Sequence, residues 1–296
     1  MRLDGHIHTG LRGDYTGTSE REKEKLMANL HKAGFDGGVI LSADPVKCRG
    51  MDPQKRMEDA LAVCKGEEYL FPLYWINPLD SDAEDQVQAA ADAGFDGFKM
   101  ICSRYDPGCK ESMRVLEKMA SLNKPVLFHS GICWDGFNSA NHNRPGNFEA
   151  LIEIPHLRFT LAHVSWPWYD ECIAVYGKFL NAHYMRPDLS CEMFIDLTPG
   201  TPRGYREEVF RHMVASEYEY RYNLIFGTDS LTTAYNVSWA REWQDRDDAL
   251  YDKFVREDVE DFKDHVYCRN LMRFLGKSDE NPSMKIPMVA DSDGDV

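Results

Sequence analysis

Short apolar runs alternate along the chain with longer amphipathic stretches, and this alternation recurs eight times. A short apolar run bounded by turn residues is typical of a buried strand, and apolar positions spaced three or four residues apart are typical of a helix. The predicted strands are residues 3–8, 37–42, 69–77, 97–101, 125–130, 158–163, 190–197 and 223–228. The predicted helices are residues 19–33, 54–65, 80–93, 111–122, 169–184, 205–218, 238–251 and 259–275, with a short one ending near residue 152.

Turn signals support this assignment. Ser19 with Glu22 three residues later has the pattern of a capping box at a helix start. Residues 32–38 and 92–98 have nearly the same sequence, and in each a glycine closes a helix just before a strand begins. The chain therefore repeats one strand–helix unit.

Eight such units in about 250 residues are the signature of a (β/α)8 TIM barrel. A doubly wound open sheet is the alternative, but it seldom needs eight regular units. We therefore predict an α/β protein with one barrel domain, residues 1–276. Residues 277–296 have little periodicity, and we predict an extended C-terminal tail there.

Composition narrows the function classes. The net charge of −15 argues against nucleic acid and anionic membrane surfaces as partners. No apolar run is long enough for a membrane span, and the N-terminus has no apolar signal-peptide core. Eight cysteines occur without a Cys-x-x-Cys pair, as expected for reduced thiols in a cytoplasmic protein. The partner we expect is a small-molecule substrate. Whether the protein forms a homo-oligomer stays open.

Titratable residues end several of the predicted strands. In a barrel of this kind the active site lies at the C-terminal ends of the strands. His6 and His8 alternate along the first strand and so project to the same side. The other titratable residues at strand ends are Lys99, His129, His163 and Asp229. Three imidazoles and a carboxylate suit Zn²⁺ or a similar divalent ion.

Several short motifs, taken in order, resemble the amidohydrolase superfamily. They are DGHIH at residues 4–8, FHS at 128–130, LAH at 161–163, FIDL at 194–197, FGTDS at 226–230 and YCRNLMRFLG at 267–276. The resemblance is to the amidohydrolase 2 branch, which holds metal-dependent hydrolases and related decarboxylases.

This resemblance implies roles for individual residues. His6, His8, His129 and Asp229 would bind the metal, and Asp229 would accept the proton of the attacking water. His163 would polarise the substrate, transfer a proton or bind a second ion. Lys99 would be a pocket residue beside a single ion, although a carbamylated bridge between two ions and a solvent-facing bystander both stay open as roles for it.

Arginines in the loops that follow the strands are candidates for substrate binding. They are Arg12, Arg49, Arg104, Arg144 and Arg203. A guanidinium binds a carboxylate through two parallel hydrogen bonds, and we select Arg104 and Arg144 for this role. Trp134, Trp166 and Trp168 either form a wall for a flat ligand or pack helices on the barrel.

The sequence thus predicts a metal-dependent hydrolase that activates water against an amide, ester or lactone of a small carboxylated molecule. The cofactor is one divalent ion, zinc being favoured, with a second ion left open. A non-oxidative decarboxylase using the same site is the alternative. A catalytically idle barrel that binds a ligand is a third hypothesis, and it predicts no bound metal.

Overall fold

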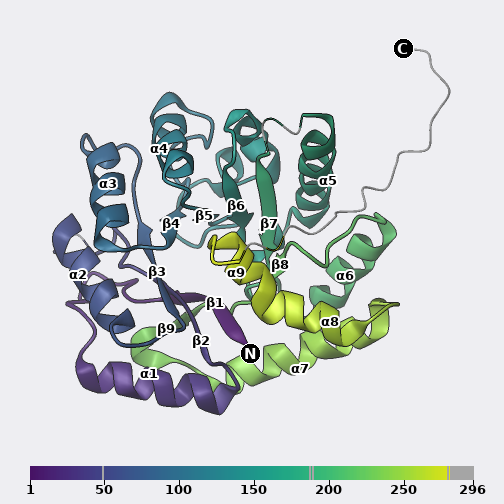
Figure 1. Cartoon of the computed structure of the whole chain (residues 1–296), viewed down its shortest axis with the longest axis horizontal. Coiled ribbons are helices and arrows are strands. Elements are labelled where there is room, and N and C mark those ends of the chain that lie inside the picture. Colours follow the sequence, from purple (N-terminus) through teal and green to yellow (C-terminus); the bar gives the residue numbers. More distant parts are fainter. Residues whose placement is uncertain (49, 187, 189, 279, 281–296) are drawn as a thin grey trace.

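The computed structural model describes residues 1–48, 50–186, 188, 190–278 and 280. Parallel strands form one curled sheet in the order β8-β7-β6-β5-β4-β3-β2-β1-β9, and helices surround it (Figure 1). The strands are β1 (Leu3–His8), β2 (Gly37–Leu41), β3 (Leu70–Trp75), β4 (Gly97–Met100), β5 (Val126–Phe128), β6 (Arg158–Leu161), β7 (Glu192–Asp196), β8 (Leu224–Ile225) and β9 (Ser230–Leu231).

The barrel closes where the last strand segment meets the first. The predicted eighth strand, residues 223–228, is shorter in the structure, where β8 pairs with β7. A separate segment beyond its predicted end, β9, pairs with β1. Between them, the Gly5 N–H donates to the Phe226 carbonyl over 2.8 Å. A Cβ at position 5 would lie 2.8 Å from that oxygen, so only glycine permits the approach. The predicted (β/α)8 barrel fold is confirmed.

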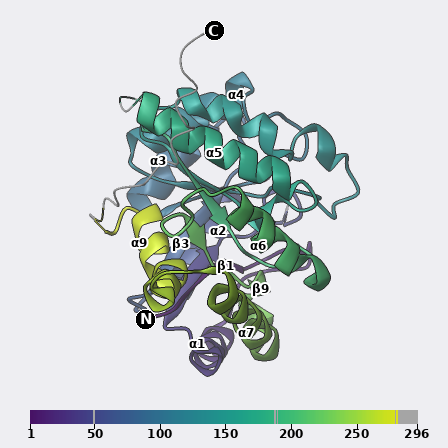
Figure 2. The same cartoon turned by 90° about the vertical axis from the view of Figure 1, so that its right-hand side faces the viewer.

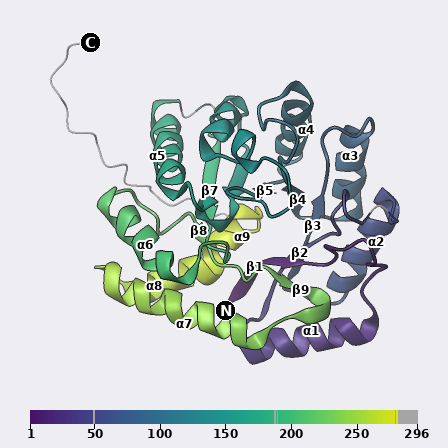
Figure 3. The ribbon, with the colours of Figure 1, turned by 180° about the vertical axis from the view of Figure 1, so that it is seen from behind.

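The helices follow the strands as predicted. They are α1 (Glu20–Ala33), α2 (Pro53–Cys64), α3 (Ala83–Ala93), α4 (Lys110–Ser121), α5 (Tyr169–Met185), α6 (Arg206–Ala215), α7 (Val237–Phe254), α8 (Val259–Asp264) and α9 (Asn270–Phe274). The capping box of Ser19 and Glu22 is present, and Gly34 and Gly94 end their helices with φ of 90° and 97°. Figure 2 shows α5 and α6 on the outside of the sheet, and Figure 3 shows α1 and α7 side by side.

Some helical predictions need correction. The predicted helix at residues 259–275 is three pieces, because a π-helical turn (His265–Arg269) separates α8 from α9. The short helix near residue 152 is a 3-10 helix, Pro145–Glu153. Of the predicted tail, Lys277 forms an ion pair with Asp96 at 2.8 Å, while residues 279 and 281–296 lie outside the described part of the chain.

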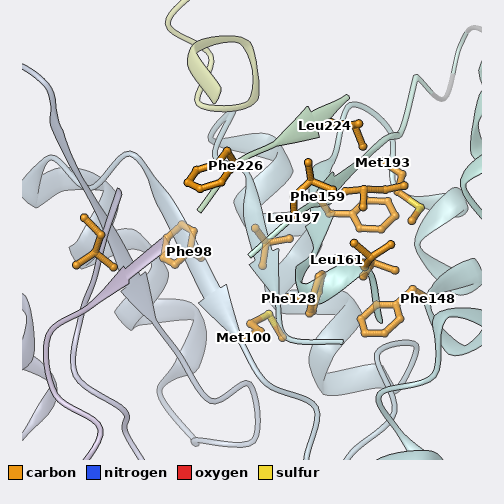
Figure 4. Close-up of a cluster of buried hydrophobic side chains, with 14 of the residues drawn as sticks. Phe98, Met100, Phe128, Phe148, Phe159, Leu161, Met193, Leu197, Leu224 and Phe226 are labelled. Carbon is orange, nitrogen blue, oxygen red and sulfur yellow. The ribbon is translucent and has the colours of Figure 1, made fainter. Parts of the chain in front are cut away.

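Two apolar layers hold the barrel together. The outer layer lies between sheet and helices and includes Phe98, Phe128 and Phe159 (Figure 4). The inner layer fills the barrel and continues into α9, where Phe274 packs edge-on against Phe194 at 5.3 Å between ring centroids.

Helix α9 lies at the N-terminal ends of the strands. The first residue of β6, Arg158, donates to the carbonyl of Phe274 over 2.8 Å. This end of the barrel is therefore closed by apolar packing, which leaves the C-terminal ends for polar side chains. Among the described residues, no helix combines the length and apolar character that crossing a membrane requires.

Candidate metal centre and active site

A bulge in β1 directs both of its histidines into the barrel. Asp4 pairs with Gly38 and Ile7 with Ile40, so β1 has one residue more than β2 over this interval. Such a bulge reverses the faces of the residues that follow it. Leu3 therefore belongs to the inner apolar layer, whereas Ile7 packs in the outer one. His6 and His8 occupy the inner face beyond the bulge.

Three ligand atoms converge at this point. The Nε2 atoms of His6 and His8 lie 3.1 Å apart, and Asp229 Oδ1 lies 3.7 Å and 3.1 Å from them. Both imidazoles are buried, whereas the Asp229 side chain is 37% exposed. The structure thus brings together three of the four predicted ligands, with the carboxylate open to the barrel mouth.

The backbone around Asp229 fixes its position. Its φ is 58°, a left-handed conformation uncommon for a residue with a side chain. Its N–H donates to the His6 carbonyl over 3.0 Å, and the preceding Thr228 donates from both N–H and hydroxyl to the buried Asp4. Burial opposes ionisation of Asp229, but the hydrogen bond from His8 and the neighbouring imidazoles outweigh it and lower its pKa.

The donor set fits a divalent metal ion. His6 Nδ1 lies 2.7 Å from Asp196 Oδ2, and both side chains are buried. A proton on Nδ1 satisfies this carboxylate and leaves a lone pair on Nε2, which faces His8 and Asp229. Burial lowers the pKa of His6, so the neutral imidazole is favoured. Two imidazole nitrogens and a carboxylate oxygen are ligands that Zn²⁺ and similar ions prefer.

Sequence reasoning did not assign a role to Asp196. Its motif served only for the family resemblance, although a buried carboxylate at the end of an apolar strand is itself a signal. Its Oδ1 accepts a 2.7 Å hydrogen bond from the Thr198 N–H and another from the Thr198 hydroxyl. Asp196 is therefore held in place from one side while it orients His6 from the other.

His163 and His129 lie beside the three-ligand cluster but are not part of it. The His163 ring centroid is 5.7 Å from that of His6 and 4.9 Å from that of His129. The Nε2 atom of His129 is buried and has no hydrogen-bond partner in the described part of the chain. Both histidines thus lie at the same end of the barrel as the cluster: the His163 ring is next to that of His6, and the His129 ring is next to that of His163.

The turn that carries His163 has a strained backbone. His163, Val164 and Ser165 have successive φ values of 64°, 47° and 55°. A left-handed conformation is costly for non-glycine residues, and especially for a β-branched one. A Cβ at Gly200 would lie 2.7 Å from the His163 Cβ, so close packing holds the imidazole in this unusual position.

Lys99 lies inside the barrel. It is 1% exposed and pairs in register with Trp75 of β3. Burial lowers its pKa to about 8, although the charges of Asp196 and Asp229 oppose this shift. The solvent-facing role for Lys99 is therefore wrong; a pocket lysine and a carbamylated bridge both stay open.

A cavity of about 630 Å³ opens beside the three-ligand cluster. Its lining residues follow β2, β3, β4 and β5, and its Trp75 wall is 5.5 Å from the His8 ring. Arg104 lines the cavity and stacks on Phe137, with 4.2 Å between the guanidinium carbon and the ring centroid.

The other selected arginine is engaged elsewhere. Arg144 donates to Glu171 over 2.6 Å and is not among the described residues that line the cavity. Arg203 likewise pairs with Glu242 at 2.8 Å. Arg49 lies outside the described residues. The structure therefore brings Arg104, but not Arg144, to the cavity beside the cluster.

Solved structures of other proteins share this fold. One is an amidohydrolase from Burkholderia multivorans with bound zinc, with a TM-score of 0.61, 11% identity and coverage of 93% of this chain and 99% of that one. Another is 2,6-dihydroxybenzoate decarboxylase from Rhizobium, with a TM-score of 0.60, 12% identity and coverage of 93% and 98%. A third is a probable 2-pyrone-4,6-dicarboxylic acid hydrolase from Acinetobacter baumannii with bound citric acid, with a TM-score of 0.59, 12% identity and coverage of 93% and 99%.

No family model and no curated protein sequence matches the chain. At these identities the likeness concerns the fold alone. That fold is the (β/α)8 barrel that the eight strand–helix units predicted.

Proposed function

We propose that this protein is a metal-dependent hydrolase that acts on an amide, ester or lactone bond of a small carboxylated molecule. One observation carries the proposal: His6, His8 and Asp229 place three ligand atoms around one point, and the carboxylate among them is 37% exposed. A divalent ion at that point would make water acidic enough to act as a nucleophile and would polarise a carbonyl.

The surrounding side chains have distinct roles in this proposal. Asp229, whose pKa is lowered, accepts the proton of the attacking water at its exposed oxygen. His163 lies one ring away and donates a proton to the leaving group. Arg104 binds the carboxylate of the substrate, and His129 completes the ligand set as the resemblance implies. Arg144 is the weaker candidate for substrate binding, since Glu171 already neutralises it.

A decarboxylase using the same site is the second candidate. Only one cluster of three potential ligands occurs in the described part of the chain, which favours one ion and a pocket role for Lys99. A buried cation beside a single ion also suits a substrate whose reacting group is itself a carboxylate. Zinc is the ion we favour for both reactions.

Metal content per chain is the decisive measurement. The metal content of wild-type protein purified without added metal is measured by elemental analysis. The His8→Ala and Asp229→Asn variants are measured in the same way. We expect about one ion per wild-type chain, with strong loss in His8→Ala. The surface variant His212→Ala is the matched control, because His212 pairs with Asp170 away from the cluster. A chain that binds no metal even when metal is added contradicts both candidate functions and leaves the idle barrel.

Acid release and carbon dioxide release then separate the two candidates. Hydrolysis of lactones and aryl esters that carry a carboxylate is followed with a pH indicator. Decarboxylation of aryl carboxylic acids is followed by the release of carbon dioxide. The hydrolase predicts turnover of the first set, with a loss of at least about 100-fold in Asp229→Asn. Turnover of the second set alone supports the decarboxylase.

A further inference from the structure

The rim of the cavity is unusually apolar. In the described part of the chain, large apolar side chains are strongly exposed at only eight positions. Three of these, Val46, Leu79 and Phe137, line the cavity with exposures of 46%, 47% and 51%. A fourth, Trp134, is 86% exposed and lies between the lining residues Cys133 and Asp135. Exposed apolar groups gathered around one opening mark a binding surface.

A cation without a carboxylate partner lies at this rim. Arg104 stacks on Phe137, but its guanidinium has no ion pair or hydrogen bond within the described residues. The neighbouring Lys47 differs, since its Nζ is 3.8 Å from Asp44 Oδ2. The Arg104 guanidinium therefore keeps its donors for a bound anion, and the stacking on Phe137 orients its plane.

The cavity also has apolar walls, formed by Trp75, Ile76, Ile101 and Tyr105. Trp75 links it with the ligand cluster, because its ring lies 5.5 Å from that of His8. A volume of about 630 Å³ is far larger than a small polar acid would fill. A molecule that fills it must bury an apolar body along these walls.

The loop with Trp134 turns at two glycines. Gly131 and Gly136 flank Trp134, and their φ values are 92° and 84°. These are left-handed conformations that glycine adopts without strain. Trp134 is consequently placed on a short segment between two left-handed turns, at the edge of the cavity.

We propose that the substrate is an amphipathic acid: an aryl or branched alkyl body that the apolar rim covers, with an anionic group bound by Arg104. This deepens the proposed function and rests on it, because it takes the cavity as the substrate site. The rim residues, Val46, Leu79, Trp134 and Phe137, then determine specificity by selecting the body, while Arg104 selects the charge.

Binding of three simple probes tests this without requiring turnover. 2-Naphthoate, the uncharged 2-naphthamide and the short acid propanoate are titrated calorimetrically into metal-depleted and zinc-loaded protein. We expect 2-naphthoate to bind at least about tenfold more tightly than either of the other probes. 2-Naphthamide contacts the apolar rim but has no charge for Arg104. Propanoate has the charge but no large apolar group for the rim.

Variants connect this preference with the named residues. Arg104→Gln should weaken the binding of 2-naphthoate by about tenfold or more and leave the affinity for 2-naphthamide unchanged. Phe137→Ala and Trp134→Ala should each lower the affinity for both naphthyl probes by about threefold or more. Met185→Ser, which changes a residue 66% exposed outside the cavity lining, and Arg21→Gln on α1 are the matched controls and should change nothing.

The outcomes separate this inference from the proposed function. Binding of 2-naphthoate with these variant effects supports the inference, even if the chain binds no metal and the hydrolase proposal fails. Metal binding with equal affinity for 2-naphthoate and propanoate overturns the inference alone. Rim variants that leave probe binding intact but change the sedimentation coefficient of the protein also overturn it, because the rim would then be an interface between copies.

Discussion

His6 and Asp196 are 190 positions apart in the sequence, yet His6 Nδ1 lies 2.7 Å from Asp196 Oδ2 in a fully buried contact. The contact joins the first strand to the seventh and determines which imidazole nitrogen carries the proton. Because Nδ1 faces a carboxylate, Nε2 is left with a free lone pair on the side that faces His8 and Asp229. Partner carboxylates of this kind fix the tautomer and raise the basicity of metal-binding histidines.

Replacing Asp196 with asparagine should therefore weaken metal binding without removing a proposed ligand. The asparagine oxygen can still accept from Thr198, so its amide N–H₂ turns toward His6 and favours the tautomer with the proton on Nε2. We expect zinc affinity to fall by about 10- to 100-fold. Competition with a chromophoric chelator measures this.

The control for this prediction is an exposed pair of the same chemistry. His212 Nδ1 lies 2.6 Å from Asp170 Oδ1 on the surface, and Asp170→Asn should leave zinc affinity unchanged. Equal zinc affinity in Asp196→Asn and wild type would show that Asp196 does not orient a metal ligand.

The strand–helix order and much of the site followed from local patterns. Apolar runs fixed the strands because barrel strands are covered on both faces, and the rule that sites lie at the C-terminal strand ends selected His6, His8 and Asp229. Alternation correctly placed both histidines on one face. It could not reveal that a bulge is needed to turn that face inward, since the bulge is defined by pairing with β2.

Other features depended on contacts distant in sequence. Asp196 has its role only because closure of the barrel brings β7 within one strand of β1. The engagement of Arg144 by Glu171 required the packing of α5, which no local signal specifies. The break between β8 and β9 likewise begins where Gly5 meets Phe226.

Adding one methyl group at Gly5 should destabilise the barrel closure. An alanine Cβ there would lie 2.7 Å from Ile225 Cγ2 and 2.8 Å from the Phe226 carbonyl oxygen, both in closely packed surroundings. We expect Gly5→Ala to lower the free energy of unfolding by about 1–3 kcal/mol in denaturant titrations. Gly204→Ala is the control, because nothing lies within 4 Å of its added Cβ. Equal loss in both variants would contradict the assignment of Gly5 to the closure.

Lys99 should make stability depend on alkaline pH. Its pKa in the folded chain is about 8, against an ordinary value of 10.5, so the unfolded chain holds more protons between these limits. Stability relative to Lys99→Met should therefore rise as the pH increases from 8 to 10.5, by at most about 3 kcal/mol, and be flat below pH 8. Denaturant titrations with a chelator present, from pH 7 to 10, measure this difference. A constant difference over that range would show that Lys99 keeps an ordinary pKa.

Arg206 and Asp247 form a buried ion pair that supports the end of β7. Arg206 donates to both Asp247 oxygens over 2.9 Å and 2.6 Å and to the Leu197 carbonyl, next to Asp196, over 2.6 Å.

Asp247→Asn leaves this guanidinium buried without its counter-charge, and we expect a loss of about 3–5 kcal/mol in the free energy of unfolding. Glu242→Gln, which breaks the exposed pair with Arg203, should have no measurable effect. The double variant Arg206→Met/Asp247→Leu should recover much of the lost stability, because neither charge is then buried. Since it still removes the bond to the Leu197 carbonyl beside Asp196, its zinc affinity should stay below that of wild type. Recovery of stability together with full zinc affinity would mean that the pair stabilises the barrel without helping to position the ligands.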